Sequence, residues 1–194
     1  MKLSFILSFL ISTFMLHAQT DTLPYYEIPP APENYTANAV LARTIDGLGY
    51  RYYWATEGLT AADLEYTPGN HGRKTEVVLE HLNGLSEVIR NAVTGKPNVR
   101  PRPERNLTQE EKRAETLHNL KAASDYLRSE KRSIEECKVT FQRGSQTSDF
   151  PVWNLLNGPL ADALYHVGQI VSYRRSAGNP MNPNVNVFSG KTGD

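Results

Sequence analysis

The sequence predicts an all-α protein: a four-helix bundle with a long crossover connection between the second and third helices and a possible small hairpin before the fourth. Apolar side chains recur every three or four residues over four segments of about 20 residues, which is the period of an amphipathic helix. Stretches rich in proline and glycine separate these segments. Neither an internal repeat nor a sustained heptad pattern is present, so the helices are expected to pack around one core.

Composition excludes several classes of function. The 194 residues carry 21 basic and 21 acidic side chains, so the formal net charge is zero. This balance excludes broad electrostatic capture of nucleic acid or of an anionic membrane as the main function. The lone cysteine, Cys137, is expected to be a packed thiol, and any metal must be held by nitrogen and oxygen atoms. We therefore expect a local function on a small-molecule substrate, without a nucleic-acid partner.

The first 18 residues predict export. Lys2 is followed by an apolar run from Leu3 to Leu16, and Ala18 is a small residue at which a secretory signal peptide is cut. The run has about 14 residues, fewer than the roughly 20 that span a bilayer. We expect a periplasmic or secreted protein that is not an integral membrane protein after cleavage. An uncleaved anchor and a buried first helix are the alternatives.

The mature chain is expected to begin with an extended lead-in over residues 19–35, because its four prolines restrict the backbone and remove hydrogen-bond donors. The first helix follows over residues 36–56, and Gly58 can terminate it. The loop after it holds one helical turn at residues 60–64. The apolar stripe of the first helix consists of Leu41, Ile45, Leu48 and Tyr52.

The second and third helices are joined by the crossover. The second helix is expected over residues 75–93, and residues 95–107 form a connection long enough to cross the end of a bundle. Thr108 and Glu111 have the spacing of a capping box, which predicts that the third helix begins there and continues to about Lys131. The apolar stripes consist of Val78, Leu82, Leu85 and Ile89, and of Leu117, Leu120, Ala123 and Leu127.

Residues 134–149 contain an alternating stretch and a turn at Gly144, which predicts a short hairpin. A fourth helix is expected over residues 151–176, capped by Asp149. The pair Gly158-Pro159 predicts a kink or local break in it, because proline removes a helical hydrogen bond. The chain thus divides into a signal peptide (1–18), a lead-in (19–35), a helical bundle (36–177) and a polar C-terminal tail (178–194).

Two of the four histidines outside the signal peptide lie where a metal can be held. His81 is on the apolar side of the second helix, and Asp162 and His166 are four residues apart on one face of the fourth. Three protein ligands leave coordination positions open, as in catalytic rather than structural sites. From the spacing alone, a surface ion pair and a hydrogen-bonded core histidine are common explanations of the same residues.

The residues around these candidates resemble a known family. Residues 75–82 (TEVVLEHL), 160–170 (LADALYHVGQI) and 53–60 (YWATEGLT) are similar to the DinB-like (DinB/YfiT-like) four-helix-bundle metalloproteins. In that family one histidine comes from the end of the second helix, and an H-x3-H pair precedes Gly-Gln on the last. The resemblance covers most of residues 36–177. It implies His81 and His166 as ligands of one divalent metal (zinc, nickel, iron or manganese) in a metal-dependent hydrolase or transferase.

Asp162 stands where the family usually has the first histidine of the pair. A carboxylate oxygen still binds these metals, but its negative charge makes a bound water ionise less readily than at a three-histidine site. Two histidines and a carboxylate also match the ligand set of non-haem iron oxygenases. The remaining interpretation is a degenerate site without metal.

The other polar and aromatic residues have simpler interpretations. Glu115 and His118 have the spacing of a di-iron motif, but a second such motif is missing from the sequence, so a surface pair is expected. The aromatic residues 50–54 are expected to pack in the core or to form a pocket wall. Gln169 is expected to bond across a helix interface or to orient a water or ligand. Solvated charges are expected at Arg100, Arg102, Arg105, Arg174 and Arg175.

The leading hypothesis is therefore an exported DinB-like protein that binds one divalent metal through His81, Asp162 and His166 and activates water or a ligand with it. Glu80 is not assigned as a base, because a residue next to His81 on a helix points about 100° away from it. The alternatives are a non-catalytic envelope protein that keeps the bundle for binding or assembly, with a degenerate metal site, and an intracellular thiol transferase. A homodimer through helix faces is compatible with each of them.

Overall fold

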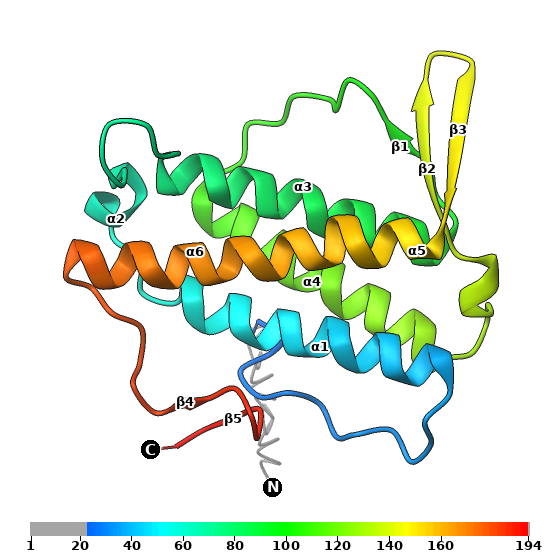
Figure 1. Cartoon of the computed structure of the whole chain (residues 1–194), viewed down its shortest axis with the longest axis horizontal. Helices are drawn as coiled ribbons and strands as arrows, with labels where there is room; N and C mark the ends of the chain where they lie inside the picture. Colours follow the sequence, from blue (N-terminus) through cyan, green and yellow to red (C-terminus); the bar gives the residue numbers. More distant parts are fainter. Residues whose placement is uncertain (1–22, 194) are drawn as a thin grey trace, which may run out of the picture.

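The computed structural model describes residues 23–193, and the predicted signal peptide (1–18) lies outside the described residues. Within this range the chain is mainly helical, with four long helices side by side and a small sheet at one end (Figure 1). None of the helices among residues 23–193 has the length and hydrophobicity that crossing a bilayer requires. The long helices are α1 (Ala37–Thr56), α3 (Thr75–Thr94), α4 (Gln109–Arg128) and α6 (Ala161–Ala177).

Polar caps and left-handed residues set the ends of these helices. The Thr36 hydroxyl accepts a hydrogen bond from the backbone N–H of Ala39 at 3.2 Å and begins α1. The predicted capping box at Thr108 is present and begins α4. Gly95 ends α3 with a φ of 74°, which glycine adopts without steric cost. The α4 helix ends before the predicted residue 131, because Glu130 has a φ of 52° that a right-handed helix excludes.

The fourth predicted helix is interrupted where the sequence indicated. It consists of α5 (Val152–Leu155), a π turn over Leu156–Leu160, and α6. Pro159 has no N–H to donate, and its ring crowds the preceding turn. The wider π turn relieves both problems, so the chain continues as a helix on either side of it.

The predicted hairpin consists of β2 (Lys138–Arg143) paired antiparallel with β3 (Gln146–Pro151). Asp149 lies in β3, where its carboxylate accepts a hydrogen bond from the Thr140 hydroxyl at 2.7 Å, so the prediction that it caps the fourth helix is wrong. The crossover supplies β1 (Asn98–Val99), which pairs parallel with β2. The other short elements are α2 (Ala61–Glu65), a 3-10 turn (Ile134–Glu136), β4 (Val185–Asn186) and β5 (Lys191–Thr192).

The hydrophobic core lies between the long helices. Both α1 and α3 pack against α4 and against α6, so each predicted apolar stripe faces inward. Leu85 is the exception and is only partly buried. Tyr50, Tyr52 and Trp54 are buried, which favours the packing interpretation of this aromatic cluster. The largest fully buried aliphatic side chains include Ile45, Leu48, Ile89, Leu117, Leu120, Leu127, Leu155 and Ile170.

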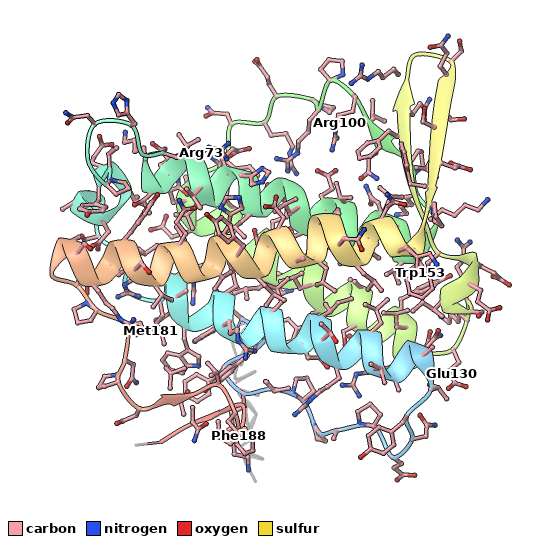
Figure 2. The ribbon with its side chains drawn as sticks, in the orientation of Figure 1. Arg73, Arg100, Glu130, Trp153, Met181 and Phe188 are labelled. Atoms are coloured by element: carbon pink, nitrogen blue, oxygen red, sulfur yellow. The ribbon has the colours of Figure 1, made fainter. Side chains whose placement is uncertain are left out.

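The lead-in and the tail both fold back onto α1. The ring of Tyr25 lies so close to Gly49 that a Cβ there would come within 2.4 Å of it. In the tail, the hydroxyls of Tyr50 and Thr192 are 2.9 Å apart. Phe188 points away from the helices and is 98% exposed (Figure 2), so the tail's aromatic side chain adds nothing to the core.

Candidate metal centre

The structure brings His81, Asp162 and His166 together between α3 and α6. The Nε2 atom of His81 lies 2.9 Å from Oδ2 of Asp162, and Nε2 of His166 lies 3.3 Å from Oδ1 of the same carboxylate. The two imidazole rings are 4.8 Å apart between centres and nearly perpendicular, at 89°. One ligand atom from each residue lies within 4.8 Å of the others, so the group could hold a metal ion.

Local helical geometry explains this convergence. Asp162 and His166 are one turn apart on α6 and therefore share a face. On α3, His81 lies beside Val78 and Leu82, which are buried in the core. Because α3 packs directly against α6, His81 faces the carboxylate from the neighbouring helix.

The site is open to solvent on one side. The side chains of His81 and Asp162 are 40% and 41% exposed, whereas that of His166 is only 8% exposed. Val77, one turn before His81, is 51% exposed. Tyr165 is 70% exposed, and its ring centre lies 5.2 Å from that of His166. A ligand that approaches these residues therefore has apolar side chains available beside the polar group.

The buried His166 is held from behind by its own helix. Its Nδ1 atom lies 2.8 Å from Oε1 of Gln169, and the amide nitrogen of Gln169 donates a hydrogen bond to the Tyr173 hydroxyl at 2.5 Å. The Tyr173 ring packs against Tyr66 at 5.6 Å between centres. The bond across a helix interface that the sequence suggested for Gln169 is therefore replaced by contacts within α6, where residues three and four apart are neighbours.

The separations suit a small divalent ion. Metal–ligand bonds of about 2.0–2.2 Å in a tetrahedral site place the ligand atoms about 3.3–3.6 Å apart. The distance of 3.3 Å between Asp162 and His166 lies in this range, and the distance of 2.9 Å between Asp162 and His81 is shorter because the two are hydrogen-bonded directly. Two imidazoles and a carboxylate are suitable ligands for zinc, iron, nickel or manganese.

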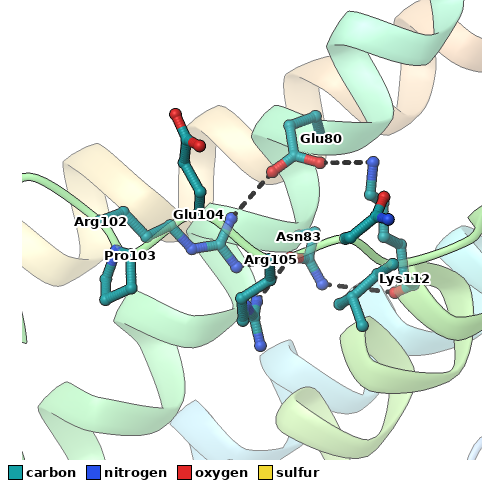
Figure 3. Close-up of a pocket in the computed structure, with 9 residues that line it drawn as sticks. Glu80, Asn83, Arg102, Pro103, Glu104, Arg105 and Lys112 are labelled. Carbon is teal, nitrogen blue, oxygen red and sulfur yellow. Dashed lines mark hydrogen bonds and ion pairs between the residues drawn. The ribbon is translucent and has the colours of Figure 1, made fainter.

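A second polar cluster lines a cavity of about 600 Å³ beneath the crossover (Figure 3). The carboxylate of Glu80 accepts hydrogen bonds from the Arg102 guanidinium at 3.1 Å and from Lys112 Nζ at 2.8 Å. Glu80 therefore faces away from His81, as the helical rotation predicts. Its charge is balanced by two cations, so it is not a free base for chemistry at the histidines.

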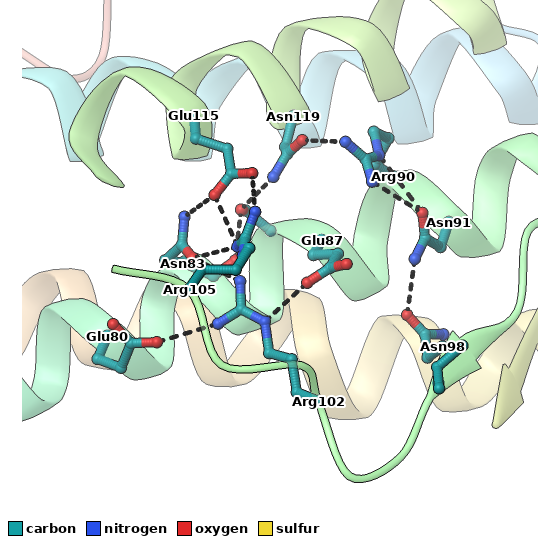
Figure 4. Close-up of polar contacts among 12 residues, drawn as sticks. Glu80, Asn83, Glu87, Arg90, Asn91, Asn98, Arg102, Arg105, Glu115 and Asn119 are labelled. Atoms are coloured by element: carbon teal, nitrogen blue, oxygen red, sulfur yellow. Dashed lines mark hydrogen bonds and ion pairs between the residues drawn. The ribbon is translucent and has the colours of Figure 1, made fainter. Parts of the chain in front are cut away.

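Asn83 is the centre of the network that holds the crossover (Figure 4). Only 1% exposed, it accepts a hydrogen bond from Arg102 at 2.6 Å and donates one to Glu115 at 2.9 Å. The Arg105 guanidinium makes two hydrogen bonds to the same Glu115 carboxylate. The prediction of a solvated charge is therefore wrong for Arg102, whose side chain is 22% exposed, whereas Arg105 remains exposed as predicted while it pairs with Glu115. Glu115 is committed to Arg105 and Asn83, which contradicts the expected surface pair with His118.

The remaining candidate residues stay outside the centre. His71 and His118 are exposed and join no potential ligand group within residues 23–193. Cys137 is fully buried, and this burial raises the pKa of its thiol, which confirms the packed interpretation. Arg174, predicted to be solvated, is only 4% exposed and bonds to the end of α1.

No protein-family model, curated protein or solved structure matches this chain. The resemblance to DinB-like proteins therefore stays a prediction from the sequence motifs.

Proposed function

We propose that this protein is a DinB-like four-helix-bundle metalloprotein that binds one divalent metal through His81, Asp162 and His166. The observation that carries the proposal is the convergence of two imidazoles and one carboxylate, from two helices, at a partly exposed position. Side chains of this chemistry are common ligands of first-row divalent metals. Three protein ligands also leave coordination positions for water or substrate.

The chemistry that fits is a metal-dependent hydrolase or transferase reaction on a small molecule. A divalent metal at this position supplies Lewis-acid activation of water or of a substrate atom. Asp162 lowers the net charge of the site by one compared with a third histidine. Because its carboxylate repels anions, the site favours neutral substrates over anionic ones. Val77 and Tyr165 beside the opening favour a substrate with an apolar group next to its reacting atom.

Export is part of the same proposal. The apolar run between Lys2 and Leu16 supports cleavage after Ala18 and a periplasmic or secreted location. N-terminal sequencing of the protein recovered from the cell envelope or the medium tests this part. A chain that retains residues 1–18 and stays inside the cell contradicts export but leaves the metal site unaffected.

Elemental analysis of the purified mature protein tests the metal site. We expect about one equivalent of divalent metal, lost in both His81→Ala and Asp162→Ala, because each variant removes one of three ligands. His118→Ala is the matched control, since this histidine is exposed on α4 and joins no ligand group. Metal that is sub-stoichiometric in the wild type, or equal in all four proteins, contradicts the proposal.

A non-catalytic envelope protein is the second candidate. It is favoured by the direct hydrogen bond between His81 and Asp162, since this contact satisfies the carboxylate without a metal. The two candidates differ in the same experiment: the non-catalytic protein folds normally, holds no stoichiometric metal and loses nothing in the two alanine variants.

A further inference from the structure

We infer that the centre is asymmetric: Gln169 presets His166 in the tautomer that binds metal, whereas His81 must change its tautomer when metal binds. This inference rests on the proposed metal site, because it assigns a role to a residue that is not itself a ligand. Gln169 is a positioning residue that acts through His166.

The first step concerns which nitrogen of His166 carries hydrogen. A neutral imidazole has one N–H donor and one bare acceptor nitrogen, and an amide oxygen can only accept. Since Oε1 of Gln169 lies 2.8 Å from Nδ1 of His166, the hydrogen is on Nδ1. The bare nitrogen is then Nε2, the atom that faces Asp162 at 3.3 Å.

This arrangement leaves two acceptors facing each other. A carboxylate oxygen and a bare imidazole nitrogen repel each other at 3.3 Å, and a cation placed between them converts that repulsion into two favourable contacts. The His166 side chain is also only 8% exposed and is held in place by its own helix, so the lone pair on its Nε2 points in one fixed direction. The geometry therefore prepares this nitrogen for a metal before any metal arrives.

His81 has the opposite arrangement. Its Nε2 lies 2.9 Å from an oxygen of Asp162, which can only accept, so Nε2 carries the hydrogen in the metal-free protein. Within residues 23–193 its Nδ1 has no hydrogen-bond partner. To bind metal through Nε2, His81 must give up this bond and move its hydrogen to Nδ1, where solvent can accept it. The exposed ligand is therefore the adjustable one.

Nitrogen-15 NMR of the histidine rings tests the inference in the metal-free mature protein. At a pH of about 8.5, above the value of about 6.5 for histidine in model peptides, we expect hydrogen on Nδ1 in His166 and on Nε2 in His81. After addition of Zn²⁺, His166 keeps its pattern and His81 switches. Hydrogen on Nε2 of His166 in the metal-free protein overturns the inference.

Variants of Gln169 give a second readout. We expect Gln169→Met to weaken Zn²⁺ binding by about 10- to 100-fold, the usual cost of losing the hydrogen-bond partner of a ligating histidine. Gln169→Glu restores an acceptor and keeps tight binding. Gln142→Met, in β2, is the matched control, and equal melting temperatures in chelator show that Gln169→Met remains folded.

The two proposals fail differently. A wild-type protein that takes up no metal contradicts the proposed function, while the ring tautomers in the metal-free protein still decide the role of Gln169. Tight metal binding that is equal in the wild type and Gln169→Met overturns the role of Gln169 and leaves the metal site standing.

Discussion

At the scale of single residues, Arg174 shows how a charged side chain completes the fold. Its guanidinium donates hydrogen bonds to the backbone carbonyls of Ala55 at 3.2 Å and Glu57 at 2.7 Å. The last carbonyls of a helix have no partner within that helix, so Arg174 satisfies the end of α1 from α6. Its neighbour Arg175 is exposed. Consecutive residues on a helix point about 100° apart, and the sequence alone does not distinguish which arginine turns inward.

Replacement of Arg174 by alanine is expected to destabilise the protein by about 2–3 kcal/mol, because it leaves buried carbonyls without donors. Urea unfolding followed by circular dichroism measures this change. The matched variant Arg175→Ala is expected to stay within about 0.5 kcal/mol of the wild type, as exposed substitutions usually do. Equal losses in the two variants contradict the capping role of Arg174.

At the scale of elements, Asp63 joins α2 to the end of α6. Its carboxylate accepts hydrogen bonds from the backbone N–H of Thr60 at 2.8 Å and from the amide of Asn179 at 2.6 Å. Burial by itself raises the pKa of Asp63, but these hydrogen bonds outweigh it and place the pKa below its ordinary value. A lowered pKa in the folded state contributes stability above the unfolded value, near pH 3.9, and loses it as the pH falls through the folded value.

The variant Asp63→Asn is therefore expected to be less stable than the wild type at pH 7 and to lose less of its stability on acidification from about pH 5 to pH 2. Urea midpoints measured across this pH range give the pH dependence of stability for the wild type and for Asp63→Asn. Asp125→Asn serves as the control, because this aspartate is in an exposed pair with Lys121. Parallel curves for the wild type and Asp63→Asn would show that Asp63 titrates alike in the folded and unfolded chain.

The crossover is a second element whose position depends on a few polar contacts. Asn83 bonds to Arg102 in the crossover and to Glu115 in α4, so it connects the segment to two helices. Replacing Asn83 with leucine is expected to cost about 1–3 kcal/mol, because it removes the hydrogen bonds that this buried amide makes to two charged side chains, Arg102 and Glu115. The same change should loosen the crossover locally.

Limited trypsin digestion measures this loosening, since Arg105 is followed by Asn106 whereas Arg100 and Arg102 are each followed by proline, which trypsin resists. We expect faster cleavage after Arg105 in Asn83→Leu than in the wild type. Asn70→Leu, at an exposed loop position, is the control. Unchanged cleavage in Asn83→Leu contradicts the anchoring role.

At the scale of the whole molecule, the long helices and the hairpin could be predicted because they follow local rules. Periodicity, the cap at Thr108, and the break at Pro159 each depend on a few neighbouring residues. The inward direction of the Arg102 and Arg174 side chains could not be predicted from the sequence, because it depends on which elements lie opposite them. The strand β1 (Asn98–Val99) could not be predicted for the same reason, since only its pairing with β2 makes it a strand.

The candidate site could be predicted from the sequence only in part. Helical spacing places Asp162 and His166 on one face, and the resemblance to DinB-like proteins indicates His81 as the third ligand. The contact between α3 and α6 that brings His81 to the carboxylate is a tertiary feature. The orientation of Gln169 toward His166 was also missed, although its i, i+3 spacing on a helix is a signal that sequence reasoning can use.

Metal binding is expected to stabilise the molecule as a whole, because the unfolded chain does not hold His81, Asp162 and His166 together. Free metal at 100 times its dissociation constant adds about 2.7 kcal/mol. For a domain of this size each kcal/mol raises Tm by roughly 2–4 °C, so scanning calorimetry with Zn²⁺ should show a rise of about 5–11 °C.

Chelation should reverse this rise, and His166→Ala should abolish it because the variant lacks the preset ligand. His118→Ala should keep it, since that side chain is exposed and joins no ligand group. A rise that persists in His166→Ala would place the stabilising metal elsewhere on the protein. A Tm that does not change in the wild type, at Zn²⁺ concentrations up to the onset of precipitation, would show that α3 and α6 hold the three side chains together for packing rather than for a metal.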